Sequence, residues 1–485
     1  MNAQTLQAAL ALLLWVPVVF YLFRRYPVSR AALYCFLGAL MFLPERAWLK
    51  FPAFPELTKD SLTTMLMGIA LFVTGARAKG RVERWWYVLS VGTIALGVAT
   101  AFTNTEPIYY GSYAVKGMNF RDGMYSSLSI FINSNLAAYI AMRCFYQEHD
   151  LERWLKILAS AGLIYAIPIL LELRFSPQVH VWIYGYPASI AFDQTIRFGG
   201  YRPMALMTHG LALSLFMLGP TIAAFTLARD KRERIWKFSA RTAAVLLLVV
   251  LIACKSTAVW LYALIAIPLV RYVNPKWTVR AAVVLALVVC LYPYLRAIDQ
   301  FPTEAVLNFA SKLGEERMGS MKFRFDNEDV LIEHAMKKPW LGWSTVYGRN
   351  MLYDETGYST TITDGGWIIA LGNGGIVGLA FYNVIPVLGI LTVARRLRRV
   401  REAKHRAMLA ALTLYLALTW VDVLPNGSFN LLPQFLSGAL CGISGALVRQ
   451  KRGTTPQPSK APPARRRPQS EVPVAASSPS AASGA

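Results

Sequence analysis

The feature that most constrains this chain is a series of long apolar runs separated by short polar or basic segments. Many runs approach the roughly 20 residues that a helix needs to cross a bilayer core. Only 16% of the 485 residues are charged, against about 25% in ordinary soluble domains. Since no soluble core could bury so many apolar runs, the pattern predicts an all-α, polytopic membrane helix bundle.

We expect about thirteen spans within a membrane domain that covers residues 1–448. The first run lacks a preceding basic segment and is followed by Arg24 and Arg25, so it should be retained as a span and not cleaved. The spans are expected near residues 5–23, 31–48, 61–76, 84–102, 125–142, 154–172, 205–228, 239–254, 256–272, 279–296, 366–393, 407–424 and 431–448.

The formal net charge of +23 could suggest a nucleic-acid partner, but its distribution argues against one. Basic residues cluster in short connections between apolar runs and do not indicate one basic surface. In a thirteen-span arrangement, the strongest clusters all fall on one side of the membrane. That side is predicted to be cytoplasmic, with the amino terminus outside and the carboxyl terminus inside. The clusters occupy residues 24–30, 77–84, 143–156, 229–241 and 395–406.

Two long connections fall on the opposite side, at residues 173–204 and 297–365. Both contain arginines, which are statistically disfavoured outside the membrane and therefore suggest a function there. We expect both loops to be partly helical. Residues 449–485 are rich in Pro, Ser, Ala and Arg, which predicts a disordered basic cytoplasmic tail beside anionic membrane lipids.

Two helical patterns occur in the second external loop. Residues 302–313 place Val306, Phe309 and Ala310 on one face, as expected of a helix that lies in the membrane interface. A second helix is expected from about residue 326 to residue 338, with Asp326 and Asn327 as caps and a proline directly after it. Arg324 would then lie just before this helix.

The spacing of this region carries a resemblance. Arg324 is followed after fifteen residues by Pro339 and three residues later by Gly342, while Gly375 and Gly378 form a second pair. This pattern resembles the superfamily of O-antigen ligases and Wzy-type polysaccharide polymerases. The ligases of that superfamily have a histidine eleven residues before the first glycine of this pair. Asp364 occupies that position here, which favours the polymerase branch.

The first external loop supplies the other half of the resemblance, which extends over roughly residues 170–380. The family has an arginine followed seven and eight residues later by asparagine and proline. Arg202 fits the arginine position, with His209 and Gly210 at the other two, and Arg197 is a second candidate.

The resemblance implies a glycosyltransferase in the bacterial inner membrane, with a periplasmic active face and a glycan on polyprenyl diphosphate as donor. Guanidinium groups suit a departing diphosphate because they stay charged and bind phosphate oxygens bidentately. Arg324 and Arg202 could thus stabilise the leaving group, and Asp364 could accept the proton of the attacking hydroxyl. No metal or other cofactor is expected. The resemblance also implies a chain-length regulator and a flippase as partners.

Each candidate also has a structural interpretation. The outward arginines could be interfacial anchors, Asp364 could cap the following helix, and His209 could be a packing or hydrogen-bonding residue. Lys255 could snorkel to the outer interface or bind phosphate.

Glu172 and Arg174 could pair with each other or contact substrate. Close helix packing is the expected role of the glycines at 372, 374, 375 and 378. The cysteines at 35, 144, 254, 290 and 441 show no metal-ligand spacing and are expected to be buried apolar side chains.

Three functions remain open at this stage. The favoured one is polymerisation of lipid-linked repeat units into exopolysaccharide or O-antigen. A ligase that moves finished glycan onto lipid A-core or a protein would share the donor site. A transporter or flippase for the same lipids would instead need charged residues along a cavity within the spans, and few spans contain them.

Overall fold

The computed structural model describes residues 5–52, 54–189, 195–312, 314–427 and 431–453. Within these ranges the chain is helical apart from connecting loops and four two-stranded hairpins, which confirms the predicted all-α class. The hairpins are β1–β2 (Trp48–Leu49, Leu57–Thr58), β3–β4 (Ile108–Tyr110, Tyr113–Val115), β5–β6 (Ile196–Arg197, Gly200–Tyr201) and β7–β8 (Arg234–Ile235, Phe238–Ser239).

Every one of the thirteen ranges expected to span the membrane contains helix. In the fifth range the helix is built from α5 and α6 with the π-helix η1 between them. The bundle helices are α1 (Leu6–Arg25), α2 (Val28–Phe42), α3 (Lys59–Val73), α4 (Arg84–Phe102), α5 (Phe120–Ile130), η1 (Phe131–Leu136), α6 (Ala137–Cys144), α7 (His149–Phe175), α9 (Gly210–Leu227), α10 (Ala240–Ala253), α11 (Thr257–Arg271), α12 (Pro275–Ala297), α15 (Gly366–Arg396), α16 (Ala403–Val421) and α17 (Leu432–Gly453).

The core of the bundle is formed around α9 and α16. Almost all residues of both helices are buried, as expected of helices that are apolar on every side. α9 packs against α7, α10, α11 and α16, while α12 lies along α16 and α6 lies along α17. Helices that begin far apart in the sequence therefore meet at the centre of the molecule.

The outer helices expose large apolar side chains. Examples are Leu14 on α1, Val88 on α4, Val249 on α10 and Leu264 on α11. In the part of the chain that the structure describes, six helices are long and apolar enough to cross a bilayer: α1, α4, α7, α9, α12 and α15. Since exposed apolar area on this scale is unfavourable in water, the structure indicates a membrane protein.

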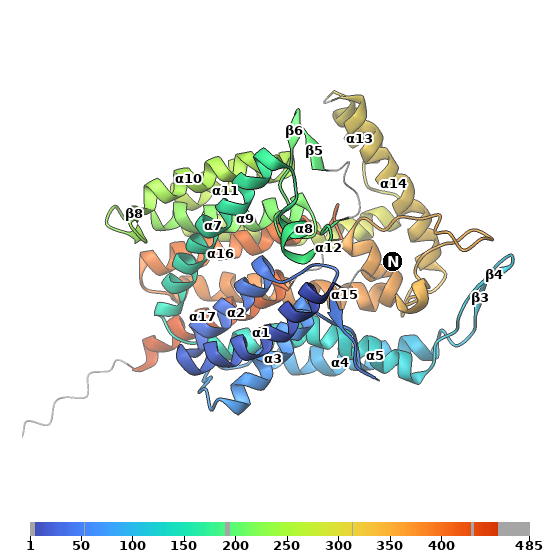
Figure 1. Ribbon diagram of the computed structural model, residues 1–485, viewed down its shortest axis with the longest axis horizontal. Helices are drawn as coiled ribbons and strands as arrows, with labels where there is room; N and C mark the ends of the chain where they lie inside the picture. Colours follow the sequence, from blue (N-terminus) through green and yellow to red (C-terminus); the bar gives the residue numbers. More distant parts are fainter. Residues whose placement is uncertain (1–4, 53, 190–194, 313, 428–430, 454–485) are drawn as a thin grey trace, which may run out of the picture.

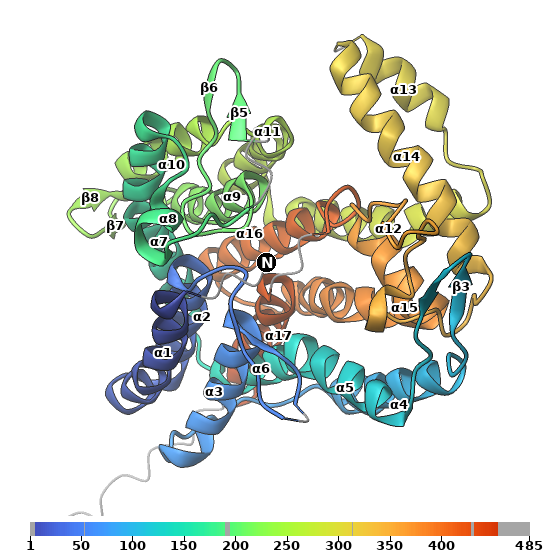
Figure 2. The ribbon, with the colours of Figure 1, turned by 45° about the vertical axis from the view of Figure 1, so that its right-hand side comes forward.

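The connections gather at two ends of the bundle. In Figure 1, β3–β4, β5–β6, α13 (Thr303–Ser311) and α14 (Glu315–Met336) lie toward the right and the top. The β7–β8 hairpin and the end of α17 lie at the left. In Figure 2, α13 and α14 project together from the bundle, and β5–β6 projects on the opposite side of the view. We call the end with these projections the loop end.

The opposite end, which we call the basic end, is held together by ion pairs between connections. Lys404 in the first turn of α16 contacts Glu152 on α7 at 2.9 Å and Glu233 beside β7 at 2.7 Å. Arg396 on α15 contacts Glu83 beside α4 at 2.6 Å. Four of the basic segments expected to share one side of the membrane therefore do lie at one end.

Some local expectations were wrong. α14 begins at Glu315 and not near residue 326, so Arg324 lies inside the helix, and neither Asp326 nor Asn327 caps it. Cys290 on α12 is exposed, although the other cysteines are buried as expected. α17 continues to Gly453, past the expected start of the tail at residue 449. The rest of the predicted disordered tail, residues 454–485, lies outside the described residues.

Candidate active site

The position of α14 is fixed by a buried cluster of polar side chains. Glu328 on α14 accepts hydrogen bonds from Tyr292 and Arg296 of α12 and from Trp367 of α15. Arg296 also contacts Asp329 at 2.6 Å. Charge-assisted bonds of this kind are stronger and more directional than neutral ones. Because Arg324 lies one helical turn before Glu328, the cluster determines where the Arg324 guanidinium is held.

Arg324 forms an ion pair with Asp364, with Nε and Oδ2 separated by 3.3 Å. Both side chains remain partly exposed. Asp364 does not cap the following helix, because the N-cap residue of α15 is Gly365 and no side-chain bond closes that end. The two residues that the sequence assigns to catalysis in the second external loop are thus direct neighbours.

The proline and glycines of the motif explain how this loop is attached to α15. Gly375 interrupts the helix with φ 63° and ψ −158°, a conformation that is open essentially only to glycine. The interruption frees backbone groups of α15. The carbonyl of Pro339 accepts a hydrogen bond from Ile376 N at 2.7 Å, and Gly372 O accepts one from Trp343 N at 2.7 Å.

Gly342 lies against the same interruption. A Cβ atom at this position would be 2.5 Å from the backbone nitrogen of Gly375, and Gly342 itself has φ +65°. The motif glycines therefore allow two backbones to pack closely, as expected from the sequence, and they do not form a phosphate-binding loop. The segment after α14 is thereby held on the helix that begins directly after Asp364.

Arg202, from the first external loop, is almost completely buried, with 2% of its surface exposed. Its Nε and Nη2 atoms have no hydrogen-bond partner among the described residues. Burial, followed by the charge of Arg197, lowers the pKa of Arg202 to about 10, so the side chain stays charged at neutral pH. Burying an unpaired charge is costly, and among the described residues the carboxylate of Asp422 acts on Arg202. The buried guanidinium therefore favours an anionic ligand.

The position of Arg202 explains why residue 210, at the end of the segment that begins with Arg202, is a glycine. A Cβ atom on Gly210 would lie 2.6 Å from Arg202 Nε. The arginine side chain therefore folds back over the first residue of α9. The amino end of a helix carries partial positive charge, so Arg202 and the start of α9 together favour binding of an anion.

His209 follows the first external loop at the start of α9. It is the N-cap residue of α9, and its Nδ1 accepts a hydrogen bond from Leu211 N at 3.1 Å. Burial, and then the positive charges of Arg202, Arg197 and Arg324, lower the pKa of His209 to about 4. The imidazole is therefore neutral at pH 7. The charges of arginines from both external loops therefore act on the His209 side chain.

Arg197 and Lys255 form the outer part of this cluster. Arg197 ends strand β5, and its carbonyl accepts a hydrogen bond from Lys255 Nζ at 3.2 Å. Lys255 lies in the turn between α10 and α11, with φ +52°. It therefore lies at the loop end of these two helices. Its contact positions the β5–β6 hairpin beside Arg202.

Glu172 and Arg174 do not pair in the way suggested by their spacing. Glu172 is buried near the end of α7 and accepts backbone hydrogen bonds from Val179, Met204 and Ala205. Arg174 lies over the ring of Phe175. Glu172 therefore ties both ends of the first external loop to α7, which is a structural role.

One acidic residue at the site was missed by the sequence analysis. Asp422 lies directly after α16, is 3% exposed and contacts Tyr262 of α11 and Asn426. Burial raises its pKa to about 6, against the opposing effects of those two contacts and of the charges of Arg324 and Arg202. A carboxylate at the end of an apolar run is a recognisable signal of function, and it was available in the sequence.

The described residues offer one group whose side chains could hold a metal ion: Glu148, Glu402 and His405. This group lies at the basic end, among the connections before α7 and α16, and is separate from the arginines. What the arginine cluster can do is bind and stabilise a multiply charged anion between two loops, with the carboxylates of Asp364 and Asp422 beside it.

Comparison with known proteins adds no assignment. No protein-family model matches this chain, and no curated protein matches it.

Proposed function

We propose that this protein is a membrane glycosyltransferase that polymerises oligosaccharide repeat units carried on polyprenyl diphosphate. The observations that carry the proposal are the buried Arg202 guanidinium folded over the start of α9 and the ion pair between Arg324 and Asp364. The charges of both arginines act on His209 and on Asp422. The unpaired buried nitrogens of Arg202 add to these observations. A diphosphate leaving group fits this cluster, because its negative charge increases as the glycosidic bond breaks.

In the proposed step, a hydroxyl oxygen of the acceptor unit attacks the anomeric carbon of the donor. The new glycosidic bond forms as the bond from that carbon to the diphosphate oxygen breaks. The bonding electrons leave with the polyprenyl diphosphate, whose charge is stabilised by Arg324 and Arg202. A neighbouring carboxylate accepts the hydroxyl proton, and Asp364 is the one indicated by the sequence. An in-line displacement inverts the anomeric configuration.

The proposal includes a topology. All thirteen bundle segments would cross the inner membrane of a bacterium, with the loop end in the periplasm and the basic end in the cytoplasm. The ion pairs that join the basic connections support this arrangement. Assembly with a chain-length regulator and a flippase belongs to the same proposal.

The proposal is tested by sizing cellular polysaccharide after deletion of the gene. A polymerase deletion leaves glycans of one repeat unit, whereas loss of a ligase leaves long chains on the carrier lipid. In purified form, the protein should convert lipid-linked repeat units into a ladder of longer products. A transporter would move such lipids between the two faces of a vesicle and lengthen none of them.

A further inference from the structure

A cavity of about 500 Å³ lies inside the bundle, next to the arginine cluster. Most of its wall is formed by α4, α5, η1, α15, α16 and α17 together with residues 344–346 of the second external loop. β2, α3 and α9 each contribute one residue: Thr58, Asp60 and Leu215. Asp422 is part of this wall and is also acted on by Arg324 and Arg202. The volume is within the range of about 300–1,000 Å³ that is typical of small-molecule sites.

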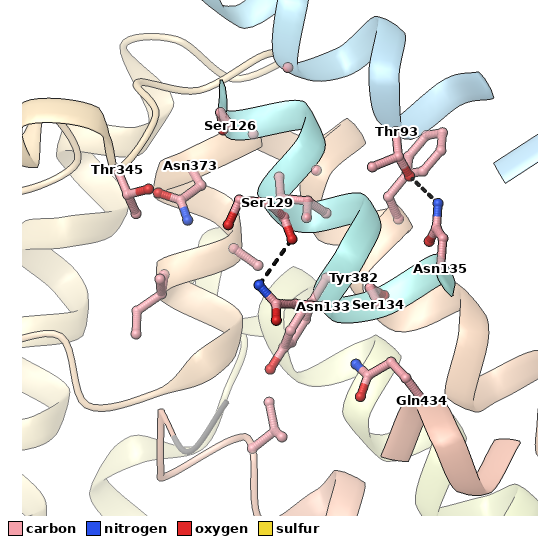
Figure 3. A pocket seen from close by; sticks show the side chains of 18 of the residues that line it. Thr93, Ser126, Ser129, Asn133, Ser134, Asn135, Thr345, Asn373, Tyr382 and Gln434 are labelled. Atoms are coloured by element: carbon pink, nitrogen blue, oxygen red, sulfur yellow. Dashed lines mark hydrogen bonds between the residues drawn. The ribbon is translucent and has the colours of Figure 1, made fainter. Parts of the chain in front are cut away.

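The cavity wall is largely apolar and also carries neutral hydrogen-bonding groups. Figure 3 shows the amides of Asn133, Asn373 and Gln434 with hydroxyls such as those of Ser129 and Tyr382. Asn373 Oδ1 and Gln434 Oε1 are buried and have no hydrogen-bond partner among the described residues. Buried polar atoms are rarely left without a partner, so these two amide oxygens indicate a polar ligand.

The π-helix η1 brings part of this polar lining together. Asn133, Ser134 and Asn135 are consecutive, and all three contribute to the wall of the cavity. π-turns within helices are frequent at functional sites. Polar side chains at this depth in a membrane bundle are costly, which argues against a purely structural role for all three.

The charge of the lining distinguishes the cavity from the arginine cluster. None of the residues that form the described wall is Lys, Arg or His, and its only charged members are Asp60 and Asp422. A diphosphate would be repelled from such a cavity. Sugar hydroxyls, in contrast, both donate and accept hydrogen bonds, and the rings of Tyr382 and Trp420 on the wall can contact the apolar face of a sugar.

We infer that this cavity binds the terminal uncharged sugar of the acceptor, and that Asp422 takes the proton from its attacking hydroxyl. The inference rests on the proposed function and adds the acceptor site to it. Asp422 is the carboxylate that belongs both to the cavity and to the surroundings of the arginines. Asp364 then acts as a positioning residue that orients Arg324 through their ion pair.

The proton step follows from this geometry. The acceptor O–H bond breaks toward a carboxylate oxygen of Asp422 while the acceptor oxygen bonds to the anomeric carbon and the diphosphate departs. The proton then passes from Asp422 to solvent. With a pKa of about 6, Asp422 is ionised at neutral pH and ready to accept a proton. Its charged or titratable neighbours from the packed elements are Tyr262, Arg324 and Arg202.

The binding half of the inference is tested by labelling a cysteine in the cavity. In a Cys290→Ser background, Ser134→Cys is reacted with a polar maleimide in nanodiscs, since the native cysteines other than Cys290 are buried. The probe is the lipid-linked repeat unit extracted from the deletion strain. We expect it to slow labelling of Ser134→Cys at least tenfold. The control Ser112→Cys, on the β3–β4 turn, should react at an unchanged rate.

Inorganic diphosphate provides the second arm of this experiment. It should bind the arginines and leave labelling of Ser134→Cys unchanged. Equal labelling with and without the lipid-linked unit would overturn the cavity assignment, and so would protection by diphosphate alone. These outcomes are independent of turnover. A protein that makes no product ladder but shows protection by the lipid-linked unit would refute the polymerase proposal and retain the glycan site.

The proton-transfer half is tested by comparing Asp422→Asn with Asp364→Asn. We expect Asp422→Asn to lower the rate at saturating substrate at least 100-fold and to abolish the decline of activity below about pH 6 that the wild type should show. Asp364→Asn should retain that acidic decline. If Asp422→Asn keeps both its rate and its acidic decline, Asp422 is not the base. Unfolding of Asp422→Asn is detected by its elution profile, in which case Asp422→Glu, which keeps a carboxylate, should restore turnover.

Discussion

The loop end and the basic end of the bundle both carry many basic side chains, but the partners of these side chains differ. At the basic end, Lys404 and Arg396 are neutralised by nearby carboxylates of other connections. At the loop end, Arg202 is almost fully buried and two of its guanidinium nitrogens have no partner among the described residues. Arg324 has one partly exposed carboxylate.

This difference indicates what each set of charges is for. Paired charges join connections to one another, and their contribution to folding is complete within the chain. An unpaired buried arginine opposes folding unless an anion arrives. We therefore interpret the basic end as structural and the loop end as a site whose counter-ion is the substrate, and substitutions at the two ends should have opposite consequences.

The largest expected effect is on catalysis at the loop end. Arg324→Lys keeps the positive charge but loses the planar fork that binds two phosphate oxygens. We expect polymer formation to fall by about 100- to 1,000-fold, the usual effect of removing one group that stabilises developing charge. Polysaccharide size is measured in a deletion strain that expresses the variant at the wild-type level. Normal chain length would remove Arg324 from the mechanism.

A second variant separates function from folding. Arg202→Met replaces a buried charge by an apolar side chain of similar length. Activity should be lost, while the free energy of unfolding should rise by about 1–3 kcal/mol because no charge is then buried. Thermal unfolding of the purified protein in detergent is the measurement. A variant that is inactive and less stable than the wild type would show that Arg202 has a structural role.

The matched substitution at the basic end should lower the free energy of unfolding, whereas Arg202→Met should raise it. Arg396 donates to Cys441 O and Ser444 Oγ and pairs with Glu83. Arg396→Met leaves these groups without their partner and should lower the free energy of unfolding by about 1–3 kcal/mol. Turnover per folded molecule should not change. A raised unfolding temperature in this variant would erase the distinction between the two ends.

The smallest effect is expected for Lys404→Ala. Lys156 contacts the same two carboxylates, Glu152 at 2.7 Å and Glu233 at 2.9 Å, so the network keeps one cation. Exposed pairs of this kind contribute roughly 0–1 kcal/mol. The unfolding temperature and the polysaccharide size should both stay close to wild type. A large loss of chain length would mean that the basic end takes part in the reaction.

The helices were predictable because apolar period and length are strong local signals. The start of α14 was not. Asp326 and Asn327 look like caps, yet residues 315–325 are mostly good helix formers, and the helix simply continues through both residues. Packing of α13 against α14 supports this longer helix, and such a contact cannot be seen in a local window of sequence.

The parts of the candidate site that could be predicted are those in which functional residues are separated by a fixed number of positions in the sequence. Gly342 and Gly375 could be found because both must accept close backbone contact, and Gly210 because Arg202 folds over it. The cavity could not be found in this way. Its unpaired amides, Asn373 and Gln434, come from α15 and α17 and converge only after the bundle has formed.

The most direct test is an experimentally determined structure of the full-length protein with a polyprenyl diphosphate bound. Guanidinium nitrogens of both Arg202 and Arg324 should lie within about 2.7–2.9 Å of oxygens of the same diphosphate, as in charge-assisted hydrogen bonds. A diphosphate held by only one of these arginines, or bound at the basic end, would contradict the account.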